Sequence, residues 1–114
     1  MVIQRGEVWW ALLGEPRGSE PGFDRPMVVV SSDSFNSSRI ATVLCVPMSS
    51  NVELAKAPGN VSVAPGLSGL ERHSVVNVSQ VITLDRFYLQ EKLGRLSSED
   101  MDSVDRGLRR SLDL

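Results

Sequence analysis

Short runs of apolar and β-branched residues, separated by stretches rich in glycine, proline and serine, fill most of the chain. Such runs predict β-strands, and the run at residues 40–47 is continuous enough to be expected at the centre of a sheet. The last run changes the phase of its alternation near Ser79 and Gln80, which predicts one long strand with a bend or bulge there. The strands are predicted at residues 7–13, 27–31, 40–47, 60–64 and 74–84.

The pattern changes to a helical period near the C-terminus. Apolar residues there stand three or four positions apart, at Met101, Val104, Leu108 and Leu112. This spacing predicts an amphipathic helix that begins after Ser97 or Ser98, with acids in its first turn and arginines in its last. Gly107 lies inside this helix, where glycine costs about 1 kcal/mol relative to alanine, so we expect close packing at that position.

Five or six short strands followed by one terminal helix predict an α+β fold. The economical arrangement is a small antiparallel sheet that curls on itself, with the helix covering one opening. The chain has 114 residues, enough to bury a core without disulfides, and we expect a single domain over residues 1–114.

Composition excludes several classes of protein. The net charge of −2 excludes a uniformly basic nucleic-acid-binding surface, although a local basic cleft remains compatible with it. Cys45 and His73 are the only residues of their types, which excludes internal disulfides, thiolate zinc clusters and two-histidine mechanisms. A magnesium site made of paired carboxylates stays open, but no carboxylate cluster has obvious ligand spacing, and we expect no metal or other cofactor. The apolar run at 8–13 is too short for a signal sequence or a membrane span, which predicts a cytoplasmic protein without membrane contact.

A predicted loop at residues 14–24, longer than the usual connection, carries the first group of candidate functional residues. It contains Arg17, Ser19 and Glu20 and leads into Arg25, which precedes a proline and is therefore biased towards an extended backbone. An arginine held in this way at the start of a buried strand can be directed at an anion. The alternative interpretation is a surface ion pair between Arg25 and a neighbouring acid.

Hydroxyl and amide side chains at the end of the predicted central strand form a second group. Ser49, Ser50 and Asn51 can donate hydrogen bonds to a phosphate or a base edge. The same residue types also stabilise ordinary turns by bonding their own backbone. Gln80 has two comparable uses, because its amide can bond a base or satisfy a neighbouring backbone group.

Some other residues are conspicuous but less specific. Trp9 and Trp10 are adjacent and must point to opposite faces of a strand, so at least one belongs to the core. The other can stack on a base or lie in a subunit interface, and we favour the interface. Cys45, in the most apolar run, is expected to be buried rather than nucleophilic. Arg72 and His73 are expected in a surface loop.

Together these segments resemble the MazF/PemK family of toxin endoribonucleases from bacterial toxin–antitoxin pairs. The motifs that carry the resemblance span nearly the whole chain: R-G-E-V-W-W at 5–10, G-S-E at 18–20, R-P-M-V-V-V at 25–30, V-P-M-S-S-N at 46–51 and Q-V-I-T-L-D at 80–85. The resemblance implies a homodimer of small SH3-like antiparallel β-barrels of the CcdB/MazF type, each with a C-terminal amphipathic helix. It also implies cleavage of single-stranded RNA without a metal.

The resemblance assigns roles to individual residues. The family's catalytic pair is the arginine of the R-P motif, which Arg25 matches, and a threonine of a P-x-T-S or P-x-T-T turn. That second position is Ser49 here, which keeps the hydroxyl but lacks the methyl group that restrains a threonine rotamer. Ser19, Glu20 and Gln80 match positions that line the family's RNA groove.

A reaction that uses the RNA's own 2′-hydroxyl suits a chain with so few nucleophilic side chains. Attack of that hydroxyl on the adjacent phosphate leaves a 2′,3′-cyclic phosphate and a 5′-hydroxyl. The reaction needs stabilisation of the charge on the phosphorane and two proton transfers. We expect Arg25 to stabilise that charge, Ser49 to donate a hydrogen bond to the phosphate and Glu20 to act as the general base.

The implied protein partner is a cognate antitoxin whose acidic, partly disordered C-terminal segment folds across the RNA groove. Two alternative functions stay open: a non-nucleolytic toxin of the same fold, such as a CcdB-like gyrase poison, and a paralogue that only binds RNA. The R-P and P-x-S-S-N motifs argue against the poison, because it has no need of an arginine–hydroxyl pair directed at phosphate.

Overall fold

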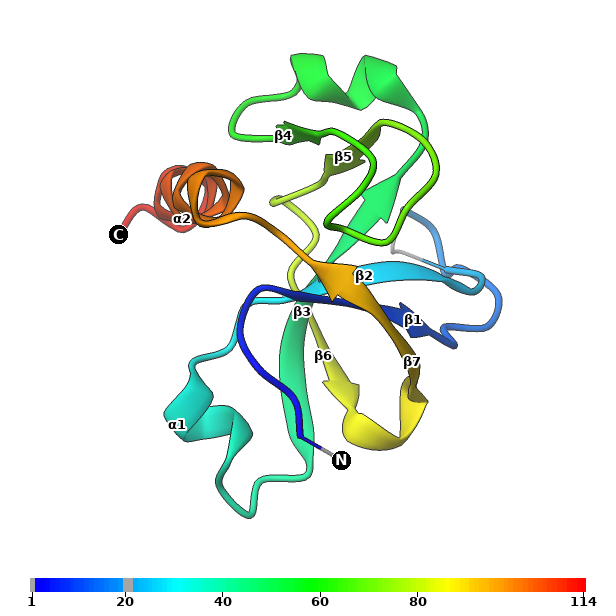
Figure 1. Cartoon of the computed structure of the whole chain (residues 1–114), viewed down its shortest axis with the longest axis vertical. Coiled ribbons are helices and arrows are strands. Elements are labelled where there is room, and N and C mark those ends of the chain that lie inside the picture. The colour runs from blue at the N-terminus through cyan, green and yellow to red at the C-terminus, as the bar shows by residue number, and fades with distance from the viewer. Residues whose placement is uncertain (1, 20–21) are drawn as a thin grey trace.

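The computed structural model describes residues 2–19 and 22–114, and its strands form one curled antiparallel sheet with a helix at the C-terminal end (Figure 1). In this part of the chain the elements follow in the order β1 (Glu7–Ala11), β2 (Arg25–Val29), α1 (Asp33–Asn36), β3 (Thr42–Ser49), the 3-10 helix η1 (Val52–Lys56), β4 (Val61–Val63), β5 (Ser74–Val76), β6 (Ile82–Asp85), the 3-10 helix η2 (Arg86–Tyr88), β7 (Leu89–Arg95) and α2 (Ser98–Leu112).

The strand order is β4-β5-β3-β2-β1-β7. β6 also pairs with β3, over residues 42–45, whereas β5 pairs with residues 48 and 49 of that strand. β3 is thus paired with three other strands, which confirms the expected central position of the run at 40–47. The predicted α+β class, a curled antiparallel sheet with a C-terminal helix, is also confirmed.

The apolar runs of β1, β2 and β3 are continuous because both faces of these strands are buried. Successive side chains of a strand point to opposite faces, so each run feeds two separate hydrophobic clusters. One cluster contains Val8, Val28, Val46, Met48 and Val76 together with Val104 and Leu108 of α2. The other contains Trp9, Met27, Val29, Val43, Cys45 and Leu84.

The expectation of one strand over residues 74–84 is wrong, although the break lies where the bend was expected. Val76 pairs with Met48 and Ile82 pairs with Cys45, so residues 77–81 stand opposite only residues 46 and 47 of β3. The surplus residues loop out of the ladder and divide the segment into β5 and β6.

β7 was not predicted from the sequence. It pairs along β1, but its sequence, L-Q-E-K-L-G-R, is mostly polar and has little intrinsic strand preference. Lys92 of β7 forms an ion pair of 2.8 Å with Glu7 of β1. The strand therefore depends on contacts with β1 that are remote in sequence.

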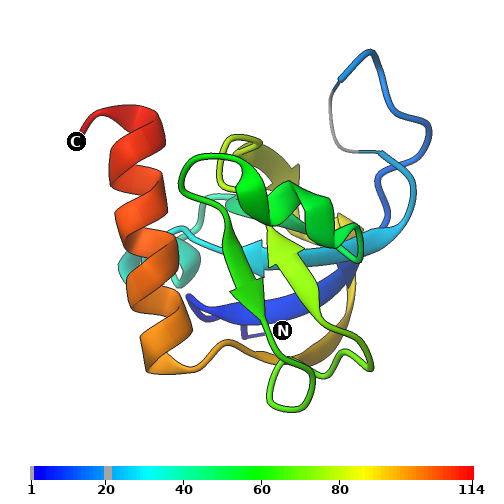
Figure 2. The same ribbon diagram turned by 90° about the horizontal axis from the view of Figure 1, so that it is seen from above.

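The C-terminal helix agrees with its sequence pattern. The hydroxyl of Ser97 accepts a hydrogen bond from the backbone N–H of Asp100 at 3.1 Å and so caps α2. Gly107 lies against the backbone carbonyl of Gly59, where a Cβ atom would collide, which confirms the expected close packing. α2 lies at one end of the β1–β2 pair, and the long loop between these strands projects at the other (Figure 2). None of the helices in residues 2–19 and 22–114 has the length and apolar character needed to span a membrane.

Candidate active site

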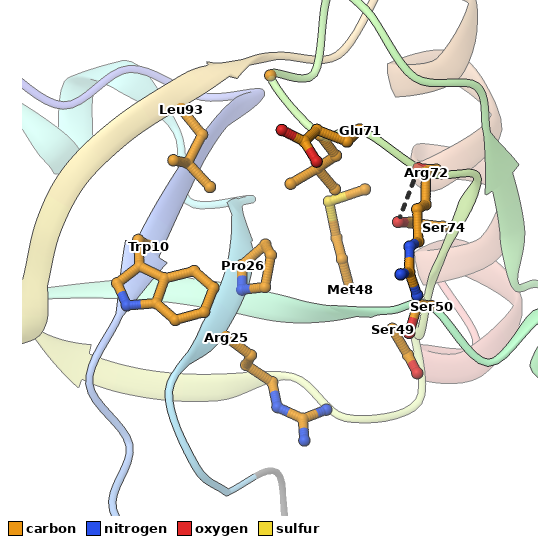
Figure 3. A pocket seen from close by; sticks show the side chains of 12 residues that line it. Trp10, Arg25, Pro26, Met48, Ser49, Ser50, Glu71, Arg72, Ser74 and Leu93 are labelled. Atoms are coloured by element: carbon orange, nitrogen blue, oxygen red, sulfur yellow. Dashed lines mark hydrogen bonds between the residues drawn. The ribbon is translucent and has the colours of Figure 1, made fainter.

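An open pocket of about 510 Å³ lies where the first hydrophobic cluster reaches the surface. The apolar part of the pocket lining is formed by Trp10, Pro26, Met48, Leu70 and Leu93. The polar part consists of the side chains of Arg25, Ser49, Ser50, Glu71, Arg72 and Ser74. The pocket thus combines an apolar surface with two guanidinium groups and with hydroxyl groups (Figure 3).

Strand register explains why the side chains of Arg25 and Ser49 point the same way at this pocket. β2 and β3 are antiparallel, with Met27 opposite Pro47. Two residues beyond that pair, the same register brings Arg25 opposite Ser49, and both side chains then point to the same face of the sheet. Figure 3 shows the guanidinium and the hydroxyl directed to the same side of the two strands.

Arg25 is held by the end of the loop that precedes it. Its Nε donates a hydrogen bond of 2.8 Å to the carbonyl oxygen of Gly22. Gly22 packs so closely on Pro16 that a Cβ atom would not fit, and the N–H of Phe23 donates to the carbonyl of Gly14. These contacts draw the two arms of the loop together. They occupy one N–H of Arg25 and leave its terminal nitrogens at the pocket.

The hydroxyl of Ser49 is oriented by the turn that follows β3. Its oxygen accepts a hydrogen bond of 3.1 Å from the backbone N–H of Asn51. Because the oxygen serves as the acceptor, the hydroxyl proton remains available for donation to an anion. The side chain of Asn51 accepts a hydrogen bond of 3.2 Å from the N–H of Glu53 and caps η1, so it stabilises the local backbone. Ser50 is exposed and lines the pocket, whereas Asn51 does not.

Arg17, Ser19 and Gln80 lie outside the pocket lining. Gln80 donates a 2.6 Å hydrogen bond from Nε2 to the carbonyl oxygen of Ser19, and its Oε1 accepts from Asn77 at 3.3 Å. Gln80 therefore connects the loop to the β5–β6 connection by satisfying a backbone group. Arg17 is exposed on the same loop. Glu20, the expected general base, lies outside the described residues.

Similarity to a known protein family extends over nearly the whole chain. The family model of PemK-like, MazF-like toxins of type II toxin–antitoxin systems matches residues 4–112. This chain belongs to that family. It is 47% identical to the endoribonuclease MazF6 of Mycobacterium tuberculosis over the full length of both chains. It is also 36% identical to the endoribonuclease EndoA of Bacillus subtilis over 115 aligned positions, which cover all of this chain and 97% of the relative.

Solved structures show that the fold is shared with MazF toxins. MazF of Deinococcus radiodurans superposes with a TM-score of 0.84 at 23% identity, over 100% of this chain and 99% of that one. A mycobacterial endoribonuclease in complex with its cognate antitoxin superposes with a TM-score of 0.80 at 24% identity, over 98% of this chain and 96% of that one.

The pocket contains residues that the sequence did not single out as functional. Glu71, Arg72 and Ser74 belong to the segment that leads into β5, where Arg72 was expected to be an ordinary surface residue. The pairing of Val75 with Ser49 carries this segment to the mouth of the pocket. No motif marks these residues, and the alternation of β5 could have located them only if its register with β3 had been known.

The two tryptophans separate as expected. Trp9 is buried, with 6% of its surface exposed, whereas Trp10 is 36% exposed and lines the pocket. The indole N–H of Trp9 donates to Glu7 at 3.1 Å, and Glu7 also accepts from the N–H of Gln4. Burial alone would raise the pKa of Glu7, but the hydrogen bonds from Lys92, Gln4 and Trp9 and the charge of Lys92 lower that pKa below its ordinary value.

Cys45 is excluded as a nucleophile by its environment. Its side chain is buried, and burial raises the pKa of the thiol to about 12, so the reactive thiolate is essentially absent at neutral pH. Across the described residues, no group of three or more histidine, cysteine or acidic side chains is placed to hold a metal ion.

Proposed function

We propose that this protein is the toxin of a type II toxin–antitoxin pair and that it acts as an endoribonuclease on single-stranded RNA. The observation that carries the proposal is the placement of Arg25 and Ser49 on facing strands at one open pocket. Membership of the MazF-like toxin family and the endoribonuclease names of two relatives support it.

In the proposed reaction, the 2′-oxygen of the RNA attacks the adjacent phosphorus while the bond from phosphorus to the 5′-oxygen breaks. The 2′-hydroxyl loses its proton to the general base, and the leaving 5′-oxygen takes up a proton from the general acid, a role for which Arg25 is the candidate. Arg25 binds the non-bridging oxygens through its terminal nitrogens, and the Ser49 hydroxyl donates a hydrogen bond to the same phosphate. The nucleophile is part of the substrate, so the step requires neither a metal nor a nucleophilic side chain.

We propose Glu20 as the general base, because it is a carboxylate at a position that matches the lining of the family's RNA groove. Substitution by glutamine keeps the size of the side chain and removes its basicity. If Glu20→Gln cleaved RNA at nearly the wild-type rate from about pH 5 to pH 9, the assignment would be wrong, although the other roles would stand.

The RNA-binding surface is proposed to extend from the pocket along the long loop. Ser50 lies in the pocket itself, whereas Arg17, Ser19, Asn51 and Gln80 lie beyond its lining. We propose that they contact nucleotides on either side of the cleaved one, by side chain or through loop backbone, as extended single strands require.

We further propose that the protein works in the cytoplasm as a homodimer and is inhibited by a cognate antitoxin. A solved mycobacterial relative is bound to such an antitoxin. An acidic, partly disordered segment of the antitoxin would place carboxylates where the pocket otherwise receives phosphates and would so cover Arg25.

The decisive experiment incubates the purified protein with a long single-stranded RNA in the presence of EDTA. Discrete fragments with 5′-hydroxyl and 2′,3′-cyclic phosphate ends are expected. The same RNA carrying 2′-O-methyl groups should remain intact, because its nucleophile is blocked. Arg25→Ala should abolish cleavage, and Arg110→Ala, which removes an exposed arginine of α2, should not. Intact RNA with the folded wild-type protein would overturn the proposal and favour a non-nucleolytic toxin or an RNA-binding paralogue.

A further inference from the structure

The proposed reaction uses one of two arginines that line the pocket. The second, Arg72, comes from residues 64–73, which connect β4 to β5. This connection is fixed to β7: the N–H of Arg95 donates to the carbonyl of Leu67 at 3.0 Å. Gly69, at a φ of +78°, fits so closely against the carbonyl of Leu93 that no Cβ atom could be accommodated. The backbone that carries Arg72 is therefore anchored on the barrel.

The other end of the connection is anchored at β5. Ser74 is buried, and its hydroxyl donates to the carbonyl oxygen of Arg72 at 3.3 Å. Val75 follows directly and pairs with Ser49. Arg72 is thus presented close to the end of β3, and in the view of Figure 3 its side chain extends from the connection towards Ser50.

The charges at the pocket favour an anion. Ion pairs in the described part of the chain engage Arg5, Lys56 and Lys92, none of which lines the pocket. Arg25 and Arg72 have no carboxylate within ion-pair distance among those residues, and Glu71 is the one acidic side chain of the lining. Two guanidinium groups at one open pocket suit a ligand that brings more than one negative charge.

The apolar part of the pocket lining suits a base between those charges. Trp10 is partly exposed beside Pro26 and Leu93, and an indole presented in this way can stack on a nucleobase. A volume of about 510 Å³ lies in the range of sites for small ligands. A base on the apolar part of the lining leaves its two flanking phosphates to separate polar groups.

We propose that Arg72 is a second phosphate-binding residue, which holds the phosphodiester next to the one that Arg25 and Ser49 bind. The pocket then binds one nucleotide of the RNA through both of its flanking phosphates. This inference rests on the proposed function, because it assumes that the ligand is single-stranded RNA. Arg72 is a positioning residue: it fixes the register of the strand and takes no part in the bond changes.

The first test measures binding as a function of salt. The probe is a short RNA centred on a cleavage site mapped with the wild-type protein, with 2′-deoxyribose at the cleaved nucleotide to prevent reaction. Each phosphate contact to a single strand contributes about 0.7 to the slope of log affinity against log salt, so Arg72→Gln should reduce the slope by about 0.7. Its binding defect relative to wild type should shrink by about fivefold between roughly 50 and 500 mM salt.

Two further variants control this measurement. Arg72→Lys keeps the charge and should retain the wild-type slope, with weaker affinity because the planar fork is lost. Arg110→Gln removes the same charge from an exposed position on α2 and should bind as the wild type does. The thermal unfolding of all three variants should match that of wild type, since both arginines are exposed.

The second test identifies the phosphate. A set of probes carries a neutral methylphosphonate at one linkage at a time. In wild type, the replacement next to the cleaved linkage should weaken binding, and in Arg72→Gln the same replacement should have no further effect. The replacement at the cleaved linkage should weaken binding equally in both proteins.

The outcomes separate this inference from the proposed function. A wild-type protein that neither cleaves nor binds RNA would remove the proposed function and this inference with it. An active wild-type protein whose slope and methylphosphonate profile are unchanged by Arg72→Gln would overturn the inference alone. If Arg72→Gln bound RNA normally but released an acidic antitoxin peptide, Arg72 would belong to the antitoxin interface and the inference would again be wrong.

Discussion

Removal of the Ser49 hydroxyl is the most direct test of the proposed chemistry. The hydroxyl accepts from the N–H of Asn51 and keeps its own proton for donation, so Ser49→Ala deletes the donor that the proposed mechanism uses in the transition state. Loss of one such donor from an enclosed site lowers the rate by about 10²–10³-fold. Ser49 is half-buried at an open pocket, where water partly replaces the donor, so we expect the lower end, about 10²-fold.

The same substitution should affect folding only slightly. The N–H of Asn51 loses one acceptor at an exposed position where water can take its place, which limits the loss of stability to about 0.5–1 kcal/mol. The assay is single-turnover cleavage at saturating RNA, with thermal unfolding measured in parallel. A Ser49→Ala protein that is folded and cleaves within threefold of the wild-type rate would refute the role of the hydroxyl.

Ser49→Thr is the complementary substitution and should raise the cleavage rate slightly. A serine hydroxyl can occupy three staggered rotamers, and the threonine methyl group restricts that choice, so full preorganisation raises the rate by at most about threefold. Because the N–H of Asn51 already restrains the hydroxyl, we expect a gain below that limit. An increase of tenfold or more would mean that serine is misplaced in the wild-type pocket.

The remaining predictions concern the parts of the fold that support the pocket. Glu7→Gln should lower the melting temperature at pH 7. Because the pKa of Glu7 is depressed in the folded protein, the difference from wild type should disappear as the pH falls below the ordinary value of 4.5 and through the folded pKa. A constant difference in melting temperature down to pH 3 would contradict this. Gly107→Ala should destabilise by about 1–3 kcal/mol in denaturant unfolding, because the collision with the Gly59 carbonyl outweighs the helix-propensity gain of about 1 kcal/mol, and a stabilised variant would contradict the packing. Gln80→Ala breaks the bond to the Ser19 carbonyl and should weaken RNA binding by a few-fold while unfolding stays within about 0.5 kcal/mol of wild type; faster proteolysis within the loop is the check, and unchanged loop protection would count against this role.

Local pattern was sufficient for the elements that carry their own signal. α2 follows from its apolar spacing and the Ser97 cap, and the central strand follows from an apolar run long enough to be buried on both faces. Arg25 could also be singled out as a candidate from the sequence, because the following proline restricts its backbone and the family motif includes it. These features depend on residues within a few positions of one another, so the sequence alone could determine them.

Tertiary structure decided everything that depends on register. Arg25 and Ser49 point to the same face of the sheet because β2 and β3 pair with Met27 opposite Pro47, and a shift of one residue would have turned the two side chains to opposite faces. Arg72 entered the pocket through the pairing of Val75 with Ser49, and the polar strand β7 formed because β1 offered it partners. Residues far apart in the chain meet through hydrogen bonds between backbones, which are common to all sequences, and the packing of two cores selects among the possible registers.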